Sequence, residues 1–460
     1  MSAFFDRVLR RSAKRRSRHL SATRIVALAF LGIILLGTGL LMLPAASRSG
    51  VSCGFRPALF TATSATCVTG LVLYDTFTQW SGFGQVVIIS LIQIGGLGFM
   101  SVATLVVFLL RKKVGLKQRL VMAQALSVSD MGDIVRLQKW VLLGSFTVEA
   151  VGALILVMRF LPDFGFPTAL KWGVFHSVSA FCNAGFDIFG CMSPGSSLAV
   201  FASDPVVLLT LSALVVIGGL GFLVWQELVT VFRSGRLSVY CRLVLVMTFG
   251  LLLFGTVAIA VAEWDQPGTI GAMSVEDKLL NSFFQSVTSR TAGFASFDQA
   301  AMTDAGKGVT MALMLVGGSS GSTAGGVKTV TVAVLLLFLR ARATGKEHVH
   351  AFRRTIPMGQ VMDAMTIFAL VGVLAFFGGV FITATSPVSF TDGLFESVSA
   401  LATVGVTAGA TGKLSVAAQF LMIVYMYFGR VGILTISLGF LMGDRAKDRF
   451  QYAETDLMIG

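Results

Sequence analysis

The stretch FTATSATCVTG, residues 60–70, recurs three more times along the 460-residue chain. The other copies are FHSVSAFCNAG at 175–185, FFQSVTSRTAG at 283–293 and FESVSALATVG at 395–405. Each copy begins with Phe, continues through residues rich in Ser, Thr and Ala, and ends in Gly. The terminal glycines lie 115, 108 and 112 residues apart, and self-similarity at a steady period indicates a fold built from copies of one unit. The sequence therefore predicts a fourfold repeat whose polar turns converge on one axis.

The composition indicates an integral membrane protein. Hydrophobic residues make up 55% of the chain and charged residues 13%, whereas charged residues are about 25% of an ordinary soluble domain. The net charge is +13, and eight basic residues precede the first apolar run. This placement is typical of a cytoplasmic anchor under the positive-inside rule and argues against a nucleic-acid partner. The run at 25–43 is longer than the apolar core of a signal peptide, so we interpret it as the first spanning helix.

Eight apolar runs are long enough to cross a bilayer, which takes about 20 residues. They form four pairs: 25–43 with 83–110, 140–161 with 205–232, 241–264 with 309–339, and 364–385 with 416–442. A shorter, more polar segment lies inside each pair, at about 57–67, 168–182, 277–290 and 390–402. Irregular backbone at membrane depth is tolerated only inside protein or beside a watery cavity. We therefore predict an all-α integral membrane fold of eight transmembrane helices and four re-entrant pore helices, arranged as four pseudosymmetric M1–P–M2 repeats.

The expected units follow from these boundaries. They are a basic cytoplasmic tail at 1–24, repeats at 25–119, 120–239, 240–354 and 355–445, and a cytoplasmic tail at 446–460. The segments expected in the cytoplasm carry 26 of the 36 Lys and Arg residues, at 1–24, 111–139, 233–242, 340–354 and 445–449. This asymmetry predicts that both termini are cytoplasmic.

The residues that close each turn are candidates for an ion filter. Replacing the hydration shell of a monovalent cation requires several carbonyl oxygens aimed at one axis, and glycine permits backbone conformations that other residues avoid. Simple helix-packing glycines are the alternative. The candidate filter residues are Val68, Thr69, Gly70, Asn183, Ala184, Gly185, Thr291, Ala292, Gly293, Thr403, Val404 and Gly405. Asp75 and Asp298 follow their glycines by five residues and are expected at the pore mouth, where acidic groups concentrate cations.

The inner member of each pair carries a second glycine-rich feature. IGGLGF occurs at 94–99 and again at 217–222, and we favour close helix packing by small residues over a hinge. The third repeat has GGSSGSTAGGVK at 317–328, which is too rich in glycine to stay helical and is predicted to form a loop across the ion path. Val327 separates Gly326 from Lys328, which excludes a nucleotide-binding P-loop. The candidate gate residues are Gly317, Gly318, Ser319, Ser320, Gly321, Ser322, Thr323, Ala324, Gly325, Gly326 and Lys328.

Arg430 stands alone in an otherwise apolar inner segment. Ionisable residues inside a membrane face the protein interior and are functional by default. We interpret Arg430 as part of the gate, and a structural salt bridge is the alternative.

On these residues the chain resembles the Trk/Ktr/HKT superfamily of cation transporters, and specifically its KtrB-type potassium-translocating subunits. The resemblance spans essentially the whole sequence, through the four M1–P–M2 units, the four turn glycines and GGSSGSTAGGVKT of the third repeat. The TrkH branch typically carries two additional N-terminal helices, whereas only a basic tail precedes the first crossing here, which favours the Ktr branch. In plant relatives, Ser in place of the first filter glycine accompanies sodium transport. Gly70 at that position implies potassium selectivity.

The resemblance also implies partners and regulation. KtrB-like subunits form homodimers with one pore per protomer, on a cytoplasmic ring of RCK-type regulatory subunits that bind ATP or ADP. Potassium is then the transported ion, sodium a possible activator, and the bacterial inner membrane the location. The loop at 317–328 would be the intramembrane gate, with Arg430 as the basic residue opposite it. No organic cofactor is expected in this chain.

Two other functional classes remain open at this point. A sodium-selective or ion-coupled symporter of the same superfamily would share the architecture. An intramembrane hydrolase would need a catalytic pair, for which Ser319 or Ser320 with Lys328 is the best candidate. We favour a channel-like subunit that is not an enzyme, because a membrane potential of 100 mV supplies about 2.3 kcal/mol per charge and inward flux then needs no ATP hydrolysis.

Overall fold

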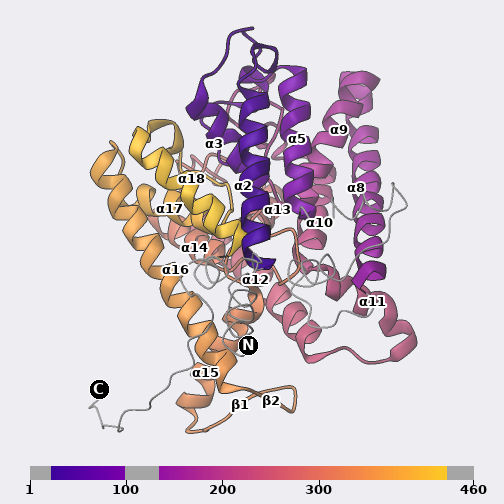
Figure 1. The fold of residues 1–460 in the computed structure, drawn as a ribbon, viewed down its shortest axis with the longest axis vertical. Coiled ribbons are helices and arrows are strands. Elements are labelled where there is room, and N and C mark those ends of the chain that lie inside the picture. Colours follow the sequence, from indigo (N-terminus) through magenta and orange to yellow (C-terminus); the bar gives the residue numbers. More distant parts are fainter. Residues whose placement is uncertain (1–21, 99–133, 433–460) are drawn as a thin grey trace, which may run out of the picture.

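Each repeat of the computed structural model begins with a long apolar helix (Figure 1). The structure describes residues 22–98 and 134–432. The long helices are α2 (Ala22–Leu41), α8 (Ile134–Phe164), α12 (Val239–Glu263) and α16 (Met358–Thr385). Their outward faces carry large apolar side chains, of which Val261 is 77% exposed. Within the described ranges these are the four helices long and apolar enough to cross a membrane unaided, and a fifth span results if one bent pair is counted as a single crossing.

A short helix follows each long helix and packs against it. The short helices lie where the sequence predicted half-helices: α3 (Phe55–Thr66), α9 (Phe166–Phe181), α13 (Val275–Thr288) and α17 (Phe390–Leu401). The side chains of Ser274 and Ser389 cap α13 and α17 by accepting a backbone N–H of the first turn. Such caps satisfy amides that a helix start leaves without a partner, so each of these two short helices has a defined beginning inside the bundle.

In the structure, the third copy of the repeated phrase starts one residue later than the sequence suggests, at Phe284 instead of Phe283. The opening Phe is buried in the other copies (Phe60, Phe175 and Phe395), and in the third copy it is Phe284, 1% exposed, that is buried. The prediction that Phe283 opens this copy is therefore wrong. Two adjacent Phe residues are equivalent in composition, and only the direction in which the helix turns them separates the core residue from its neighbour.

In the first, second and fourth repeats the inner helix ends before its apolar run does. α5 (Gly82–Leu97), α10 (Pro205–Leu220) and α18 (Val416–Val431) have 16 residues each, and α14 (Asp304–Leu315) has 12. A 16-residue helix is about 24 Å long, less than the about 30 Å core of a bilayer. Three of these helices end at a glycine with positive φ: Gly98 at 80°, Gly221 at 89° and Gly432 at 94°.

In the second repeat the chain changes direction sharply at such a glycine. Beyond Gly221 it continues as α11 (Phe222–Ser234), bent by 96° from α10, so the prediction of an unbroken helix over 205–232 is wrong. A φ of 89° suits glycine, and the last glycine of the motif therefore ends the helix. Gly218 does pack closely, against the carbonyl of Phe181, as expected of small residues. The predicted ends of the first and fourth inner helices, residues 110 and 442, lie outside the described residues.

In the third repeat the expected interruption is present. α14 ends at Leu315 and α15 (Thr329–Ala343) begins after Lys328, with no helix between them. We call residues 317–328 the inner loop.

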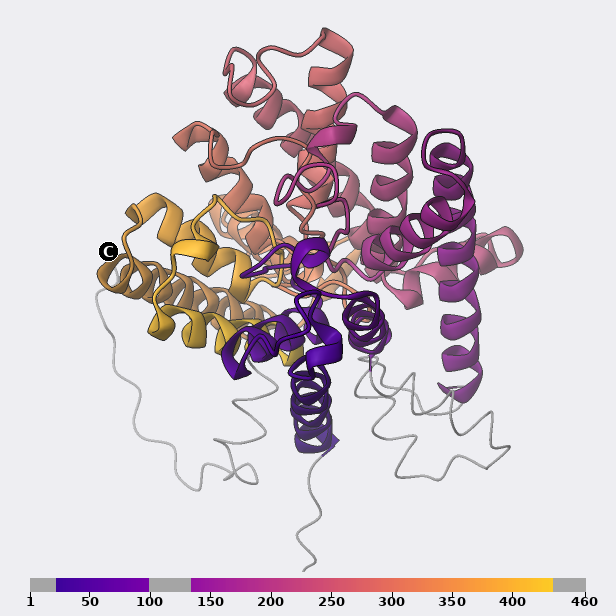
Figure 2. The same cartoon turned by 90° about the horizontal axis from the view of Figure 1, so that it is seen from above.

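The four repeats close into a ring when the molecule is seen from above (Figure 2). Each inner helix packs against the short helix of the next repeat: α5 on α9, α10 on α13, α14 on α17, and α18 on α3. The last contact joins the fourth repeat to the first, so no repeat stands at an edge.

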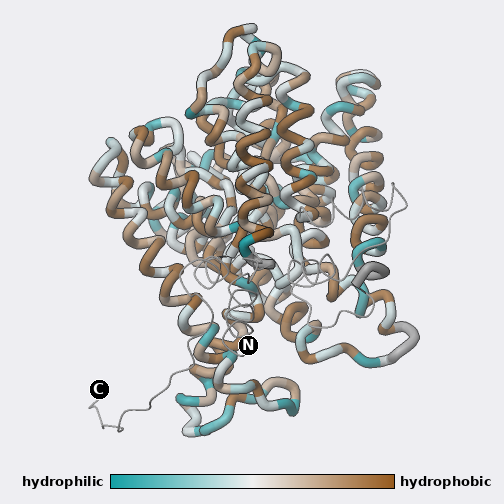
Figure 3. Tube along the Cα trace, viewed as in Figure 1, coloured by the Kyte–Doolittle hydropathy of each residue, from teal (hydrophilic) through white to brown (hydrophobic). Residues whose placement is uncertain are grey.

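The two ends of the molecule differ in polarity from its middle. Apolar residues follow the long helices, and polar residues gather at the ends (Figure 3). One end carries the α11–α12 connection and an antiparallel hairpin of β1 (Val349–Ala351) and β2 (Arg354–Ile356). Short elements shape the connecting loops: η1 (Pro44–Ala46) precedes the short helix α3, whereas α4 (Thr76–Gln79), η2 (Ala199–Phe201) and η3 (Thr411–Lys413) precede inner helices.

Candidate functional site

The four turns that follow the short helices share one backbone conformation. The residue two positions before each glycine has positive φ: Val68 at 50°, Asn183 at 58°, Thr291 at 73° and Thr403 at 52°. The glycines follow with φ of 96°, 69°, 84° and 95°, at Gly70, Gly185, Gly293 and Gly405. Positive φ is uncommon outside glycine, so its recurrence at equivalent positions indicates one turn built four times.

The four turns meet in a closed ring. A Cβ atom placed on Gly70 would lie 2.5 Å from the carbonyl oxygen of Ala184 in the next repeat. A Cβ atom on Gly185 would lie 2.6 Å from Ala292 O, and one on Gly293 would lie 2.7 Å from Val404 O. A Cβ atom on Gly405 would overlap Thr69 O. The contacts thus pass from the first repeat through the fourth and back to the first. We call residues 68–70, 183–185, 291–293 and 403–405 the glycine ring.

Hydroxyl groups of the short helices hold each turn from within its own repeat. Ser399 accepts the Gly405 N–H at 3.1 Å and donates to the Val406 carbonyl at 2.7 Å. Ser64 accepts the Gly70 N–H at 3.1 Å, and Ser179 donates to the Phe186 carbonyl at 2.7 Å. Thr288 makes the matching 2.7 Å bond to Phe294 O. These hydroxyl groups come from the Ser- and Thr-rich part of each repeated phrase.

A second set of side chains, which the sequence patterns did not reveal, holds the chain beyond each turn. It comes from the residue after the buried Phe in three repeats: His176, Gln285 and Glu396. Gln285 exchanges two amide hydrogen bonds with Gln299, at 2.6 and 3.1 Å. Glu396 accepts hydrogen bonds from Thr407 and, at 2.8 Å, from Thr411. The signal available in sequence was a polar residue at this one position of the repeat.

His176 illustrates how such a residue works. Its Nδ1 lies 2.7 Å from the Trp172 carbonyl, and its Nε2 accepts the Ile188 N–H at 3.2 Å. One nitrogen donates and the other accepts, which fits a neutral imidazole. The ring also stacks on Phe189 with centroids 3.8 Å apart. His176 therefore fastens the chain after Gly185 to the short helix, and this explains its place near the turn without any catalytic role.

A cavity of about 570 Å³ opens above the glycine ring and is lined by all four ring glycines together with Asp75, Asp187 and Asp298. Asp75 accepts backbone N–H groups of Thr78 at 2.8 Å and Gly195 at 3.1 Å. Burial and the negative charge of Asp75 raise the pKa of Asp187 to about 7. The two predicted mouth residues therefore line the cavity, and Asp75 is also part of its frame.

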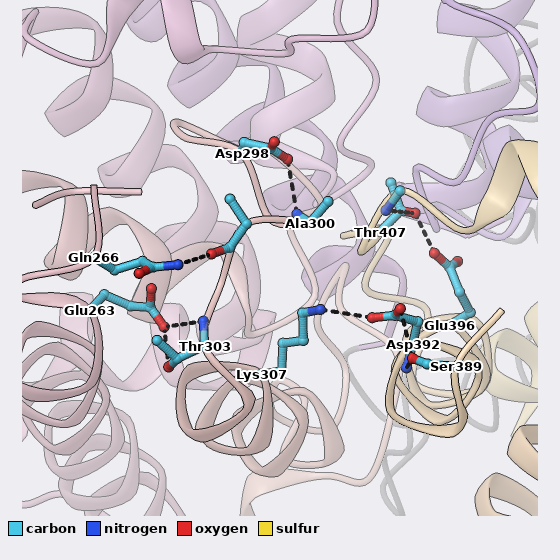
Figure 4. Close-up of polar contacts among 12 residues, drawn as sticks. Glu263, Gln266, Asp298, Ala300, Thr303, Lys307, Ser389, Asp392, Glu396 and Thr407 are labelled. Atoms are coloured by element: carbon cyan, nitrogen blue, oxygen red, sulfur yellow. Dashed lines mark hydrogen bonds and ion pairs between the residues drawn. The ribbon is translucent and has the colours of Figure 1, made fainter. Parts of the chain in front are cut away.

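An ion pair joins the third and fourth repeats, and hydrogen bonds hold the loop that precedes α14 (Figure 4). Lys307 Nζ of α14 lies 2.8 Å from Asp392 Oδ1 of α17. Within the third repeat, Glu263 accepts the Thr303 N–H at 3.0 Å, and Asp298 accepts the Ala300 N–H at 2.9 Å. These contacts fix the loops of the mouth.

The inner loop is anchored to the break in the second repeat. The Ser319 N–H donates to Gly219 O at 3.0 Å, and the Thr323 N–H donates to Gly218 O at 3.3 Å. In return the Phe222 N–H donates to Gly321 O at 2.9 Å. The last carbonyls of a helix lack partners within that helix. Ending α10 at Leu220 therefore makes these groups available to the loop.

Two cations of the predicted gate bind the inner loop through backbone carbonyls. Arg430 donates to Thr323 O of the loop and to Gly95 O and, at 3.0 Å, Gly96 O of the first repeat. Lys328 Nζ donates to Ala324 O at 2.8 Å. Over residues 22–98 and 134–432 neither cation forms an ion pair, so the described contacts give no support to the salt-bridge interpretation of Arg430.

The described residues do not assemble the Ser/Lys pair of a hydrolase. Ser319 Oγ lies 3.2 Å from Thr329 Oγ1, and Lys328 Nζ is engaged with Ala324 O. Across the described ranges no group of three or more His, Cys, Asp or Glu side chains is placed to hold a metal ion. Glu149 and Glu227 are acids within apolar runs, and each has a hydrogen-bond partner: Glu149 accepts from Gln93 at 2.9 Å and Glu227 from Ser238 at 2.7 Å.

Comparison with known proteins matches the chain to a family of cation transport proteins. The family model TrkH, described as a cation transport protein, matches residues 7–447. The chain is 38% identical over 452 residues to the potassium/sodium uptake protein NtpJ of Enterococcus hirae, which covers 97% of this chain and 99% of that protein. It is also 38% identical over 431 residues to the Ktr system potassium uptake protein B of Bacillus subtilis, which covers 94% of this chain and 95% of the relative. The protein of the same name from Vibrio alginolyticus is 36% identical, with 95% and 94% covered.

A solved structure supports the same fold. The crystal structure of the potassium transporter TrkH from Vibrio parahaemolyticus matches with a TM-score of 0.72 and covers 94% of this chain and 86% of that chain. The sequence identity of 17% limits this likeness to the fold.

Proposed function

The chain belongs to the TrkH family of cation transport proteins, and from this premise we propose that it is a potassium-uptake subunit with the glycine ring as its ion filter. The family transports cations and is not a family of enzymes. Two relatives at 38% identity are named as a potassium/sodium uptake protein and a potassium uptake protein. Potassium would therefore be the transported ion, entering along its electrochemical gradient.

The single observation that carries the proposal is the closed ring. The carbonyls of Thr69, Ala184, Ala292 and Val404 each lie beside the glycine of a neighbouring repeat, which supports the proposal that backbone oxygens of all four turns face a common axis. Rings of backbone carbonyls can replace the hydration shell of potassium. Asp75 and Asp298, which line the cavity, would collect cations at the mouth.

In this proposal the chain crosses a bacterial inner membrane eight times. The long helices and the inner helices make the crossings, and α3, α9, α13 and α17 are re-entrant pore helices. Lys and Arg residues are concentrated at 233–242 and 340–354, and the α11–α12 connection and the β1–β2 hairpin lie at the same end of the molecule (Figure 1). This placement favours that end, and both termini, on the cytoplasmic side.

The test is potassium uptake by a transport-deficient bacterial strain that expresses the chain. Wild type should restore growth at low potassium, and Gly70→Asp and Gly405→Asp should not, because a side chain at either glycine meets a backbone carbonyl of another repeat. Gly359→Asp is the matched control, since a Cβ at Gly359 meets nothing within 4 Å. Normal growth with both ring substitutions would contradict the filter assignment.

Sodium transport is the second candidate, because one of the relatives is named as a potassium/sodium uptake protein. Fluxes of potassium, rubidium and sodium into proteoliposomes separate the two. A preference for potassium and rubidium supports the first candidate, and equal or greater sodium flux supports the second. The same assay with an added sodium gradient tests sodium as an activator or a coupled ion.

The inner loop, with Lys328 and Arg430, would close the path below the ring. The loop is held by backbone bonds to a neighbouring repeat and by Arg430, and such bonds can exchange for others as the loop moves. Gating also requires a controlling partner. Two of the relatives are named as potassium uptake proteins of a Ktr system, which supports a regulatory partner. In this proposal the chain forms a homodimer on a cytoplasmic RCK-type ring that binds ATP or ADP. Flux measured with and without that ring, and with each nucleotide, tests this part.

A further inference from the structure

We propose that the side chain of Asn183 links the inner loop to the glycine ring, so that the position of the loop sets the ion preference of the ring. The inference rests on the proposed function and adds a means of regulation to it. It concerns a side chain, whereas the filter role assigned to Asn183 above concerns only its backbone.

Three buried side chains form the link. Thr323 Oγ1 of the inner loop donates toward Asn183 Oδ1 at 3.2 Å, and Asn183 Nδ2 donates to Thr291 Oγ1 at 3.2 Å. Asn183 is 1% exposed, and both threonines are fully buried. The link therefore runs, shielded from water, from the loop through the second turn of the ring to the third.

Asparagine suits this position for two reasons. Its φ of 58° is one that Asn tolerates better than most residues. Its carboxamide accepts through one atom and donates through the other, so a single side chain can serve a partner on each side. A side chain at residue 183 that is apolar, or that can only donate or only accept a hydrogen bond, could keep the turn but could not form both bonds of the link.

The equivalent positions of the other repeats carry no such bridge. Val68 is apolar, and the hydroxyl of Thr403 has no hydrogen-bond partner among the described residues. Thr291 is itself the acceptor of the Asn183 bond. Among the four ring positions in the described chain, only the second therefore reaches the loop through a side-chain hydrogen bond.

On the loop side of the link, Thr323 also forms hydrogen bonds with other groups. The Thr323 carbonyl accepts from Arg430, and the Thr323 N–H donates to Gly218 O. The Thr323 hydroxyl also lies 3.1 Å from Phe181 O, close to the ring in sequence. Movement of the loop out of the ion path must displace Thr323, and the buried carboxamide of Asn183 then loses a partner. An unsatisfied buried polar group is unfavourable, so Asn183 and the ring around it should rearrange.

The experiment measures the loop and the ring separately in full-length protein. Amide hydrogen exchange of residues 317–328 reports the loop, and the ratio of potassium to sodium flux in proteoliposomes reports the ring. The variants are Asn183→Gly, which keeps positive φ accessible, and Thr323→Val, which replaces the hydroxyl at constant shape. Each should speed loop exchange by about fivefold, the value of one neutral hydrogen bond, and each should lower the flux ratio.

The double variant decides whether the two residues act through one link. If they do, Asn183→Gly with Thr323→Val changes exchange and flux ratio no more than either substitution alone, and Thr323→Ser restores both toward wild type. Effects that multiply in the double variant, or a change in only one of the two measurements, would overturn the proposal. So would two single variants that behave as wild type.

A control and a reference separate this inference from the proposed function. Thr310→Val removes a buried hydroxyl that has no partner within the described residues, and it should leave loop exchange unchanged. If proteoliposomes that contain the wild-type protein showed no cation flux, the proposed function itself would be contradicted. If the wild-type protein transports cations and the variants match it in loop exchange and flux ratio, only the link is contradicted.

Discussion

The glycine ring and the inner loop are both irregular backbone inside a bundle of helices, but they are held in different ways. Each turn of the ring is fixed from within its own repeat, as Ser399 fixes Gly405. The inner loop has bonds within the third repeat, such as Gly317 N–H to Val327 O at 2.9 Å, but it also binds Gly218 and Gly219 of the second repeat and Arg430 of the fourth. The ring turns are therefore held mainly from within their own repeats, whereas the loop depends on its neighbours as well.

This difference separates a part that should stay from a part that can move. Backbone groups at membrane depth need partners inside the protein, and both regions meet that need. Local bonds survive when repeats shift against one another, whereas bonds between repeats must then break. A filter benefits from the first arrangement and a gate from the second.

The largest expected effect comes from breaking the ring with a single methyl group. Gly405 has a φ of 95°, and a Cβ there overlaps Thr69 O. We expect Gly405→Ala to reduce potassium uptake about 100-fold, since positive-φ strain and overlap together amount to about 3 kcal/mol. Gly32→Ala in α2 is the control, because a Cβ at that position meets nothing within 4 Å. Uptake by Gly405→Ala at the wild-type rate would remove the ring from the conduction path.

A smaller effect should follow from releasing the loop. Arg430→Gln loses charge-assisted bonds to the carbonyls of Thr323, Gly95 and Gly96, and bonds to charged groups contribute about 1.5–3 kcal/mol. We expect at least about tenfold faster amide exchange in residues 317–328 and greater cation flux without activation.

The ring amides of the first repeat should keep their exchange rates in this variant, because Ser64 still holds Gly70. Arg159→Gln serves as the control, since Arg159 forms only partly exposed ion pairs with Asp163 and Asp204. Faster exchange at the ring with an unchanged loop would reverse the comparison.

The smallest effect concerns a contact outside both regions. Burial alone would raise the pKa of Asp392, but hydrogen bonds from Lys307 and Ser389 and the charges of Lys307 and Lys413 outweigh it, so the pKa is lowered. A carboxyl whose folded pKa is lowered stabilises the fold above its unfolded pKa, about 3.9. That stabilisation is lost as the pH falls through the folded pKa.

Lys307→Gln should therefore lower the free energy of unfolding by about 1 kcal/mol at pH 7, with a difference that shrinks below about pH 4. Thermal unfolding of purified protein at several pH values measures it. Loop exchange should not change, because the Lys307–Asp392 contact joins α14 to α17 (Figure 4) and is separate from the hydrogen bonds that hold the inner loop. A difference that stays constant as the pH falls below about 4, or one that appears only at low pH, would contradict the ion-pair explanation.

Much of the framework was predictable because it depends on local patterns. Apolar runs specify the long helices, and the repeated phrase ending in Gly70, Gly185, Gly293 and Gly405 specifies four equivalent turns. The inner loop was predictable as well, since five glycines in residues 317–328 cannot sustain a helix. In each case the neighbouring residues alone carry the signal.

Other features depended on partners far along the chain. The break at Gly221 could not be separated from close packing, because glycine serves both purposes. The shift from Phe283 to Phe284 required knowledge of which side chain faces the core. The roles of His176 and Glu396 required the chain beyond each turn to fold back onto the short helix.

The sequence by itself determined that this protein is a fourfold membrane repeat with glycine turns and one glycine-rich interruption, because hydropathy and glycine content act over a few residues at a time. Only the tertiary structure decided that the turns close into a ring and that the loop binds the broken helix of another repeat. Those contacts join residues of different repeats, far apart along the chain. No local pattern encodes such a pairing, which is chosen by the shape and the hydrogen-bonding needs of the assembled bundle.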